Sequence, residues 1–333
     1  MLNLLKPFGS VSKLEKLLEG LPVEVVGVSA TPPPQGELDD KLARCDVLVA
    51  DVDISVDRAL VARAPRLKAV LCMSIGVDYV DQEALDERGI LLANDRDFCV
   101  TAVSEFTMGL IYALLRRIPA GVEALKAKRW GTRSALGGVE LQGRVLGLVA
   151  FGHIGRDVAR QAIGIGMKVV AYSPNIDKEV ARRMGVEPVS FEELLRTADI
   201  VSLHMPLNAA TQAMIGAREL GMMKCGSYLI NVARGGVVDE AALLDAIKSG
   251  KLAGAALDVL ENEPPKPGDP LSALMGGENV IITPHIAWHS HDASQKALTR
   301  IREQVESLLR GETPKDCLNA NKGRPFDIKT VSD

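Results

Sequence analysis

The chain has 333 residues, of which 47% are hydrophobic and 25% charged, and its formal net charge is −4. This length predicts two domains, and the mildly acidic, mixed charge excludes the basic surface of a nucleic-acid-binding protein. Five scattered cysteines without a Cys-x-x-Cys pair argue against a disulfide framework. The chain has no apolar run of about 18 residues and no signal-peptide core, so we expect a cytoplasmic protein without a membrane partner.

Short apolar runs alternate with helical patterns over the first hundred residues. Strands are predicted at 23–28, 46–51, 67–73 and 89–94, and helices at 11–20 and 81–89. This alternation predicts a parallel sheet with helices on both faces. The following segment, 101–118, is apolar nearly all round, which predicts a helix buried in a core or in an interface.

A second series of strands and helices begins near residue 144. Its strands are predicted at 144–150, 168–173, 199–204, 227–232, 253–259 and 279–284, with helices between them. A long amphipathic helix is predicted over 292–311, where Gly311 ends it. The pattern as a whole predicts an α/β fold with doubly wound parallel sheets.

The stretch AFGHIG (150–155) joins a predicted strand to a predicted helix and approximates the dinucleotide-binding template G-x-G-x-x-G. Gly152 would let the backbone approach a pyrophosphate, and Gly155 would let the helix pack on the strand. The helix amino terminus would offer free N–H groups to the phosphates. Ala150 replaces the first glycine, which we expect to be acceptable only if its φ is negative. A tight strand-to-helix turn without a ligand is the alternative.

Ser173 stands 21 positions after Gly152, where an acidic residue would bind the adenosine ribose. A carboxylate that would repel a 2′-phosphate is therefore missing from this position. No arginine follows immediately, although Lys178, Arg182 and Arg183 lie further along. We therefore predict that NADP is used as well as NAD.

Polar residues stand at the carboxyl ends of three later strands: Arg234, then Asp258, Glu261 and Glu263, and finally His285. The arginine fork matches a carboxylate and could polarise a carbonyl. A histidine oriented by a carboxylate is a general acid–base catalyst. With a nicotinamide holding the hydride, this set would interconvert a 2-keto acid and a 2-hydroxy acid. The alternatives are a surface ion pair for Arg234, a solvated loop charge for Glu263 and a structural role for His285.

Three of the five histidines lie in HIAWHSH, residues 285–291. No nearby cysteine or acid pair completes a set of metal ligands, so we expect no metal site. His285 ends a core strand, where chemistry is expected. His289 and His291 follow it, and we expect them to be solvated or to line the crossover between domains, with one bordering the substrate as the alternative.

These residues carry a resemblance to the D-isomer-specific 2-hydroxyacid dehydrogenase family, from about residue 40 to 320. GRVLGLVAFGHIG, VSLHMPL, LINVARGGVVDEAALLDAIKSGKLAGAALDV, ENEP and TPHIA stand in the family's order and spacing. The resemblance implies two Rossmann-like doubly wound domains. An NAD(P)-binding domain, 101–288, would be inserted into a flavodoxin-like substrate-binding domain, 1–100 and 289–333. It also implies a homodimer formed through the 101–140 segment.

The resemblance also implies a role for individual residues. Arg234 would bind the substrate carboxylate and carbonyl, Glu263 would orient and charge His285, and His285 would transfer the proton. The other substrate-binding groups would be the backbone N–H groups around Ser74, Ile75 and Gly76, together with Trp288. The cofactor would be bound by Gly152, His153, Ile154, Gly155, Ser173, His204, Pro206, Thr211 and Ala233, with Asp258 bonding the nicotinamide amide and Val103 packing near that ring.

The implied reaction is hydride transfer between NAD(P)H and a small 2-keto acid such as hydroxypyruvate or glyoxylate. Trp288 resembles the glycerate dehydrogenase and hydroxypyruvate reductase branch of the family. A phosphoglycerate dehydrogenase is one alternative. A dinucleotide-sensing binding protein, like the corepressors that share this fold, is another, and turnover of 2-keto acids distinguishes it from an enzyme.

Overall fold

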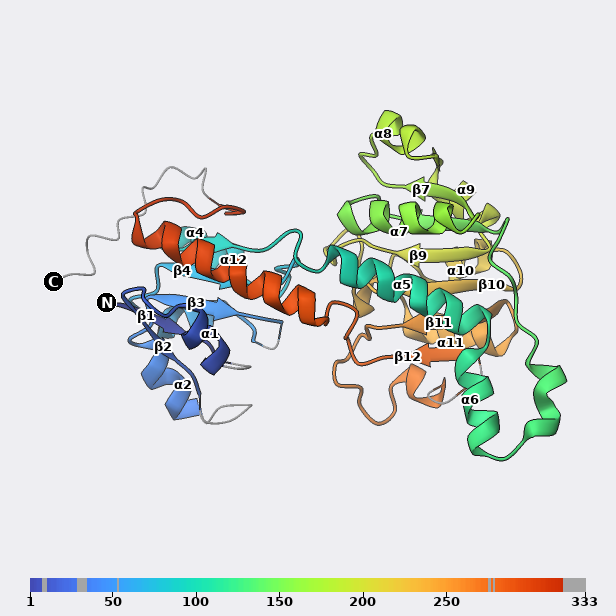
Figure 1. Ribbon diagram of the computed structural model, residues 1–333, viewed down its shortest axis with the longest axis horizontal. Helices are drawn as coiled ribbons and strands as arrows, with labels where there is room; N and C mark the ends of the chain where they lie inside the picture. The colour runs from blue at the N-terminus through green and yellow to red at the C-terminus, as the bar shows by residue number, and fades with distance from the viewer. Residues whose placement is uncertain (8–10, 29–34, 53, 275–276, 278, 320–333) are drawn as a thin grey trace. The chain divides into compact units, whose positions relative to one another are not determined.

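The computed structural model describes residues 1–7, 11–28, 35–52, 54–274, 277 and 279–319 (Figure 1). The chain divides into two compact units, of which unit 1 comprises Met1–Phe98 with His291–Asp333 and unit 2 comprises Cys99–Ser290. The chain therefore passes from unit 1 to unit 2 after residue 98 and returns to unit 1 after residue 290. Both units are α/β structures with parallel sheets, as predicted.

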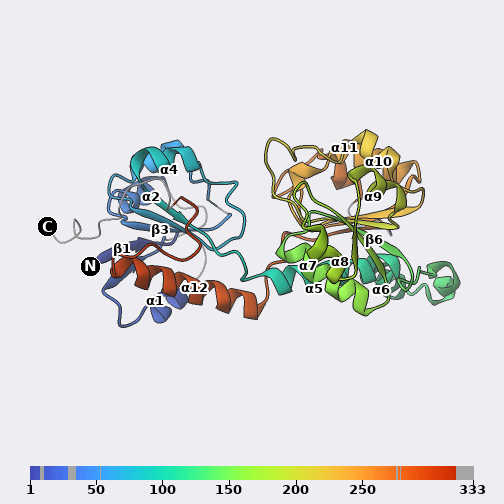
Figure 2. The same cartoon turned by 90° about the horizontal axis from the view of Figure 1, so that it is seen from above.

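Unit 1 is built on a five-stranded parallel sheet in the order β2-β1-β3-β4-β5. The strands are β1 (Leu2–Leu5), β2 (Val23–Val26), β3 (Val47–Ala50), β4 (Ala69–Cys72) and β5 (Leu91–Ala93). Helices α1 (Val11–Leu17) and α12 (His291–Leu309) cover one face, and α2 (Gln35–Leu42), α3 (Arg58–Arg63) and α4 (Gln82–Arg88) cover the other (Figure 2).

Strand β3 shows why such strands are apolar throughout. Its side chains alternate between the two faces of the sheet. Val47 and Val49 pack in the core beneath α1 and α12, whereas Leu48 and Ala50 pack in the core on the opposite face. All four are buried, which is the pattern of a parallel sheet covered on both sides.

Unit 2 is built on a seven-stranded parallel sheet in the order β12-β11-β10-β9-β6-β7-β8. The strands are β6 (Val145–Val149), β7 (Lys168–Tyr172), β8 (Val186–Pro188), β9 (Ile200–Leu203), β10 (Ser227–Asn231), β11 (Leu252–Leu257) and β12 (Val280–Ile282). The strand order reverses between β6 and β9, which is the point where doubly wound folds bind their ligands.

Helices cover both faces of this sheet as well. Helices α5 (Val100–Leu115) and α7 (His153–Gly164) lie on one face (Figure 2). The other face carries α9 (Phe191–Thr197), α10 (Ala217–Met222) and α11 (Glu240–Lys248), while α8 (Lys178–Arg183) packs beside β8. None of the described helices combines the length and the apolar character needed to span a bilayer.

The helix predicted over the apolar segment 101–118 is confirmed, and it ends three residues earlier than predicted. Helix α5 ends at Leu115, and α6 (Ile118–Lys126) follows after Arg117, whose φ of 52° breaks the helical path. Pro119 explains the new start, because proline is favoured in the first turn of a helix and unfavourable in its interior. Helix α5 is buried against α7 and strands β10–β12, so its apolar face belongs to the core of unit 2.

Candidate active site

The sheet order of unit 2 brings the predicted functional residues to one edge. Parallel strands end on the same side of a sheet, so residues that follow different strands become neighbours. Starting at the β12 end, the residues beyond the strand ends are His285 after β12, Asp258 after β11, Arg234 after β10, His204 after β9, Gly152 after β6 and Ser173 after β7. The acid–base groups thus stand on one side of the reversal point, and the glycine-rich turn stands next to it.

His285 and Glu263 form a hydrogen-bonded pair. His285 Nδ1 lies 2.7 Å from Glu263 Oε2, and Glu263 Oε1 accepts the Leu260 N–H at 2.9 Å. Burial alone would raise the pKa of Glu263, but the hydrogen bonds and the positive charges of His285 and Arg234 outweigh it, so this pKa is lowered. An ionised carboxylate can only accept, so Nδ1 carries a proton and His285 Nε2 is the atom left to exchange one.

Asp258 holds the backbone that presents His285. Its carboxylate is 1% exposed and accepts the hydroxyl of Thr283 at 2.6 Å and the N–H groups of Ile286 and Ala287 at 3.0 and 2.7 Å. Burial raises the pKa of Asp258 against the opposing effect of these hydrogen bonds. His285 itself has a φ of 52°, a strained conformation that such surrounding contacts maintain.

The backbone next to Arg234 makes a very close contact with the segment that precedes Glu263. A Cβ placed on Gly235 would lie 1.9 Å from the carbonyl carbon and oxygen of Leu260, so only glycine fits. Asn231 supports the turn, since its Nδ2 donates to the carbonyl of Arg234 and its Oδ1 accepts the N–H of Ala233, each at 3.0 Å. The ARGG stretch and the ENEP stretch are therefore held against each other.

Three supporting residues were not identified from the sequence. Asn231 and Thr283 hold the two strand ends, and Glu240, 5% exposed, accepts the Glu261 N–H at 2.7 Å. A polar residue at the end of an otherwise apolar strand was the available signal for Asn231 and Thr283. The Glu261 side chain is exposed, and among the described contacts Glu263 is the acid that pairs with His285.

The glycine-rich turn has the shape that a pyrophosphate requires. Gly152 is the exposed N-cap of α7, and a Cβ there would meet no described atom within 4 Å. A Cβ on Gly155 would lie 2.6 Å from the Ala150 carbonyl oxygen, so Gly155 permits the close helix–strand contact. His153 and Ile154 form the first turn of α7, whose N–H groups suit a diphosphate. These residues fit a dinucleotide cofactor.

Ala150 corrects the expectation of a negative φ. Its φ is 77°, so alanine adopts the left-handed conformation that the missing first glycine would take without strain. The turn from β6 into α7 imposes this conformation, because the Ala150 N–H also bonds the Tyr172 carbonyl of the neighbouring strand. Alanine therefore forms this turn at a cost of about 1–2 kcal/mol.

His204 carries a buried polar atom without a partner. Its Nε2 lies 2.9 Å from the Ser202 hydroxyl, whereas its Nδ1 is buried and has no hydrogen bond among the described residues. Burial lowers the pKa of His204 from 6.5 to about 4, so the ring is neutral near pH 7. Thr211 closes the next turn by donating its hydroxyl to the Pro206 carbonyl at 2.6 Å.

The remaining residues predicted to bind cofactor or substrate occupy the following places. Val103 and Ala233 are 5% and 8% exposed, and Ser173 is half-buried directly after β7. Trp288 is half-buried and stacks on His289 at 4.9 Å between ring centroids. In unit 1, the Ser74–Gly76 loop follows the carboxyl end of β4.

The other two histidines of the HIAWHSH stretch are exposed. His289 follows the last turn of unit 2, and His291 is the first residue of α12. In the part of the chain that the structure describes, no group of three or more His, Cys, Asp or Glu side chains is arranged to hold a metal ion.

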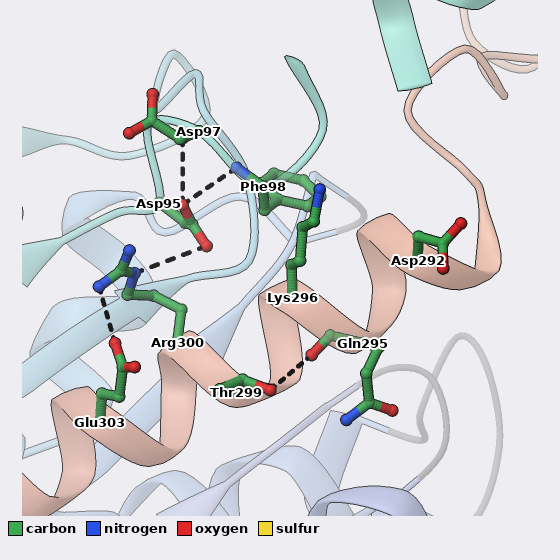
Figure 3. Close-up of a pocket in the computed structure, with 9 residues that line it drawn as sticks. All are labelled: Asp95, Asp97, Phe98, Asp292, Gln295, Lys296, Thr299, Arg300 and Glu303. Carbon is green, nitrogen blue, oxygen red and sulfur yellow. Dashed lines mark hydrogen bonds and ion pairs between the residues drawn. The ribbon is translucent and has the colours of Figure 1, made fainter. Parts of the chain in front are cut away.

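A pocket of about 520 Å³ lies within unit 1, between residues 95–98 and the first turns of α12 (Figure 3). Its walls carry side chains of both charges, and Arg300 faces Asp95 across it. None of the predicted catalytic, cofactor-binding or substrate-binding residues lines it. The predicted chemistry therefore belongs to the strand ends and not to this pocket.

The chain is similar to known proteins over most of its length. A family model described as "D-isomer specific 2-hydroxyacid dehydrogenase, NAD binding domain" matches residues 108–287. A glyoxylate reductase of Thermococcus litoralis is 36% identical over 294 residues, which are 86% of this chain and 87% of that protein. A D-3-phosphoglycerate dehydrogenase of Methanocaldococcus jannaschii is 41% identical over 284 residues, 85% of this chain and 53% of that protein.

Solved structures share the fold over nearly the whole chain. The TT0316 protein of Thermus thermophilus gives a TM-score of 0.84 at 34% identity, covering 95% of this chain and all of that one. A D-lactate dehydrogenase of Aquifex aeolicus, complexed with NAD and lactic acid, gives 0.84 at 28% identity, covering 93% and 96%. The chain spans about half the length of the phosphoglycerate dehydrogenases that it matches.

Proposed function

The chain belongs to the D-isomer-specific 2-hydroxyacid dehydrogenase family, and on this basis we propose that it transfers a hydride between NAD(P)H and a small 2-keto acid. The observation that carries the proposal is the 2.7 Å contact between His285 Nδ1 and Glu263 Oε2, beside Arg234. Hydroxypyruvate and glyoxylate are the proposed substrates. The glyoxylate reductase relative, which has nearly the same length, supports glyoxylate in particular.

In the proposed mechanism, His285 is the acid. A bound reduced nicotinamide would supply the hydride to the keto carbon. His285 Nε2 would give its proton to the keto oxygen, and the negative charge of Glu263 would stabilise the charged imidazole before the transfer. Arg234 would bind the carboxylate and polarise the carbonyl through its planar fork. Oxidation of the D-hydroxy acid would reverse each step.

The cofactor would lie along the β6–β9 half of the edge. Gly152, His153, Ile154 and Gly155 would bind the pyrophosphate, and Ser173 would face the adenosine ribose without repelling a 2′-phosphate. The residues proposed to line the rest of the cofactor site are His204, Pro206, Thr211, Ala233, Val103 and Asp258. We propose that both NAD and NADP are used, because no acidic side chain stands at residue 173.

The substrate would also contact unit 1. The backbone N–H groups of the Ser74, Ile75 and Gly76 loop are proposed to bind its carboxylate, and Trp288 is proposed to border its side chain. Oxygen anions bound by consecutive backbone N–H groups are a common arrangement. Unit 1 is therefore proposed as the substrate-binding domain and unit 2 as the cofactor domain.

A panel of 2-keto acids tests the activity. Glyoxylate, hydroxypyruvate, pyruvate and 3-phosphohydroxypyruvate would be assayed with NADH and NADPH side by side by the absorbance of the reduced nicotinamide. We expect the highest kcat/KM with one of the first two acids and measurable rates with both cofactors. Preference for 3-phosphohydroxypyruvate would assign a phosphoglycerate dehydrogenase. Absence of turnover with every pair would favour a dinucleotide-sensing binding protein.

We further propose a cytoplasmic homodimer formed through the 101–140 segment. Among the described residues, five of the eight exposed large hydrophobic side chains lie there: Tyr112, Ile118, Val122, Leu125 and Trp130. Ile118, Val122 and Leu125 are spaced to share one face of α6, and Leu125 and Trp130 are 60% and 67% exposed. Exposed apolar side chains that cluster in this way mark interaction surfaces.

Light scattering coupled to gel filtration measures the dimer. We expect a dimeric wild type, a monomeric Leu125→Glu variant, and a dimeric Val52→Glu control, since Val52 is an exposed apolar residue of unit 1. A wild type that is monomeric at micromolar concentration would contradict the proposal.

A further inference from the structure

The loop Ser74–Gly76 in unit 1 has each of its backbone carbonyls held by a hydrogen bond. The Asp95 N–H donates to the Ser74 carbonyl at 3.4 Å, and the Ser74 hydroxyl donates to the Gly76 carbonyl at 2.7 Å. Between them, Asn94 Nδ2 donates to the Ile75 carbonyl at 2.7 Å. The orientation of the loop therefore depends on groups outside it, above all on the segment Asn94–Asp95.

A held carbonyl also fixes the next N–H group. The peptide unit is planar and trans, so the carbonyl of one residue and the N–H of the next point in opposite directions. With the Ile75 carbonyl turned toward Asn94, the Gly76 N–H must point away from it. Among the described residues, the N–H groups of Ile75, Gly76 and Val77 have no hydrogen-bond partner, so they are available to an anion.

Asn94 is itself held from the opposite side, by helix α12. Gln304, 1% exposed, donates its Nε2 to the Asn94 carbonyl at 2.9 Å. One turn earlier, Arg300 Nε lies 3.8 Å from Asp95 Oδ2, the pair drawn in Figure 3. Asp95 Oδ1 accepts the N–H groups of Asp97 and Phe98 at 3.1 and 3.2 Å. Segment 94–98 is thus fixed between the loop and α12.

We infer that Asn94 is a positioning residue for the carboxylate-binding loop, aiming the Gly76 N–H at the substrate carboxylate through the Ile75 carbonyl. The inference rests on the proposed function, because it deepens the role given to the loop. Asn94 is 4% exposed, and its Oδ1 is buried without a partner, so the described hydrogen bond of its side chain is the one to Ile75. A buried side-chain amide that makes one described hydrogen bond needs an explanation, and here the explanation is that the bond positions the Ile75 carbonyl.

The test uses oxamate, a carboxylate-bearing analogue of a 2-keto acid, and the full chain loaded with NADH. Oxamate binding is measured by nicotinamide fluorescence for the wild type, Asn94→Leu and Asn94→Asp. We expect both variants to lose at least about tenfold in oxamate affinity at neutral pH, since a directed bond to an anion-binding group is lost. The NADH dissociation constant should stay within about twofold, because unit 2 carries the proposed cofactor site.

Asn94→Asp adds a second measurement, the pH dependence of oxamate binding. This dependence would not change if Asn94 had only a structural role. An ionised aspartate cannot donate to the Ile75 carbonyl, whereas a protonated one can. Its oxamate affinity, divided by the wild-type value at the same pH, should therefore rise as the pH falls through the pKa of the introduced carboxyl. The ratio for Asn94→Leu should stay flat. This comparison remains available if the leucine variant fails to fold, because aspartate is isosteric with asparagine.

The outcomes separate this inference from the proposed function. Oxamate binding at the wild-type level by a folded variant overturns the inference and leaves the proposed function intact. A flat pH ratio for Asn94→Asp also overturns it. A wild type that binds NADH but no oxamate, and turns over no 2-keto acid, overturns both. In steady-state assays the loss should appear mainly in KM, with kcat changed less.

Discussion

At the β10–β12 end of the unit 2 sheet, functional side chains are held by other side chains and by donated backbone bonds. Asp258 alone accepts three hydrogen bonds, and Glu263 accepts two. At the β6–β9 end, the surface proposed to bind the cofactor is formed by the backbone. Its main feature is the open space at Gly152, where a Cβ would meet no described atom within 4 Å. We call the β10–β12 end the charged frame and the β6–β9 end the open cradle. Substitutions in the charged frame should change the rate of the reaction, whereas substitutions in the open cradle should change cofactor binding or the stability of the fold.

The largest effect is expected at the charged frame. His285→Ala should lower kcat by about 10²–10⁴, because it removes the proposed proton donor, with a smaller effect on KM. Glu263→Gln should lower kcat less, since the amide oxygen can still accept from Nδ1 but no longer stabilises the charged ring. Steady-state kinetics measures both. Full kcat in His285→Ala would show that the proton comes from elsewhere.

His204, at the β6–β9 end, gives a prediction about how the free energy of unfolding depends on pH. The pKa of His204 is lowered from 6.5 to about 4 by burial, so between these values the unfolded chain binds a proton that the folded chain does not. Stability from this group is complete above pH 6.5 and is lost as the pH falls toward 4, by up to about 3 kcal/mol. Urea unfolding of the wild type and His204→Asn at pH 7 and pH 4.5 measures the difference. Equal losses in the two proteins would refute the assignment.

The two glycines of the turn should respond differently to the same change. Gly155→Ala forces a Cβ to within 2.6 Å of the Ala150 carbonyl, which should lower the free energy of unfolding by about 1–3 kcal/mol. Gly152→Ala meets no described atom and has a permissive φ of −79°, so stability should be kept while NADH binding weakens. Urea unfolding and fluorescence titration measure the two effects. Equal losses of stability in the two variants would mean that the space around Gly152 is as tightly packed as that around Gly155.

The smallest expected effect is an increase in stability. Ala150→Gly should raise the free energy of unfolding by about 0.5–1 kcal/mol, because glycine adopts a φ of 77° without strain. Ala113→Gly is the matched control and should do the opposite, since Ala113 lies in helix α5 and glycine disfavours a helix interior. Both are measured by urea unfolding. A loss of stability in Ala150→Gly would show that the backbone of Ala150 is not strained.

The apolar runs of the sequence predicted β2–β7 and β9–β12, because both faces of a covered parallel sheet select apolar residues. They did not reveal β1 (Leu2–Leu5), which begins at the second residue of the chain, or β8 (Val186–Pro188), which has three residues and lies at the edge of its sheet. The positions of Arg234 and His285 after strands made them candidates, whereas the choice of Glu263 over Asp258 and Glu261 came from the resemblance to the family. Their contacts depended on the approach of Gly235 to Leu260, a distance between segments that no local pattern encodes.

The conformation of Ala150 shows a similar limit. Alanine predicts a negative φ, yet the hydrogen bond to the Tyr172 carbonyl and the contact with Gly155 determine the turn. Tertiary structure overrode local preference there. The end of α5 lay closer to its prediction: the helix stops three residues before the predicted end at 118, and Pro119, just beyond that end, stands in the first turn of α6.

Helix α12 has a consequence for biosynthesis. Ile301, Val305 and Leu308 complete the core in which Leu4 and Val47 are buried, yet the 192 residues of unit 2, Cys99–Ser290, lie between α12 and the amino-terminal part of unit 1. During translation, the strands of unit 1 and helix α1 emerge before unit 2, and the core that α12 completes stays partly uncovered until α12 leaves the ribosome. Unit 2, which is continuous in sequence, can fold during that interval. Synthesis of unit 1 therefore begins before that of unit 2, but its core is completed after it.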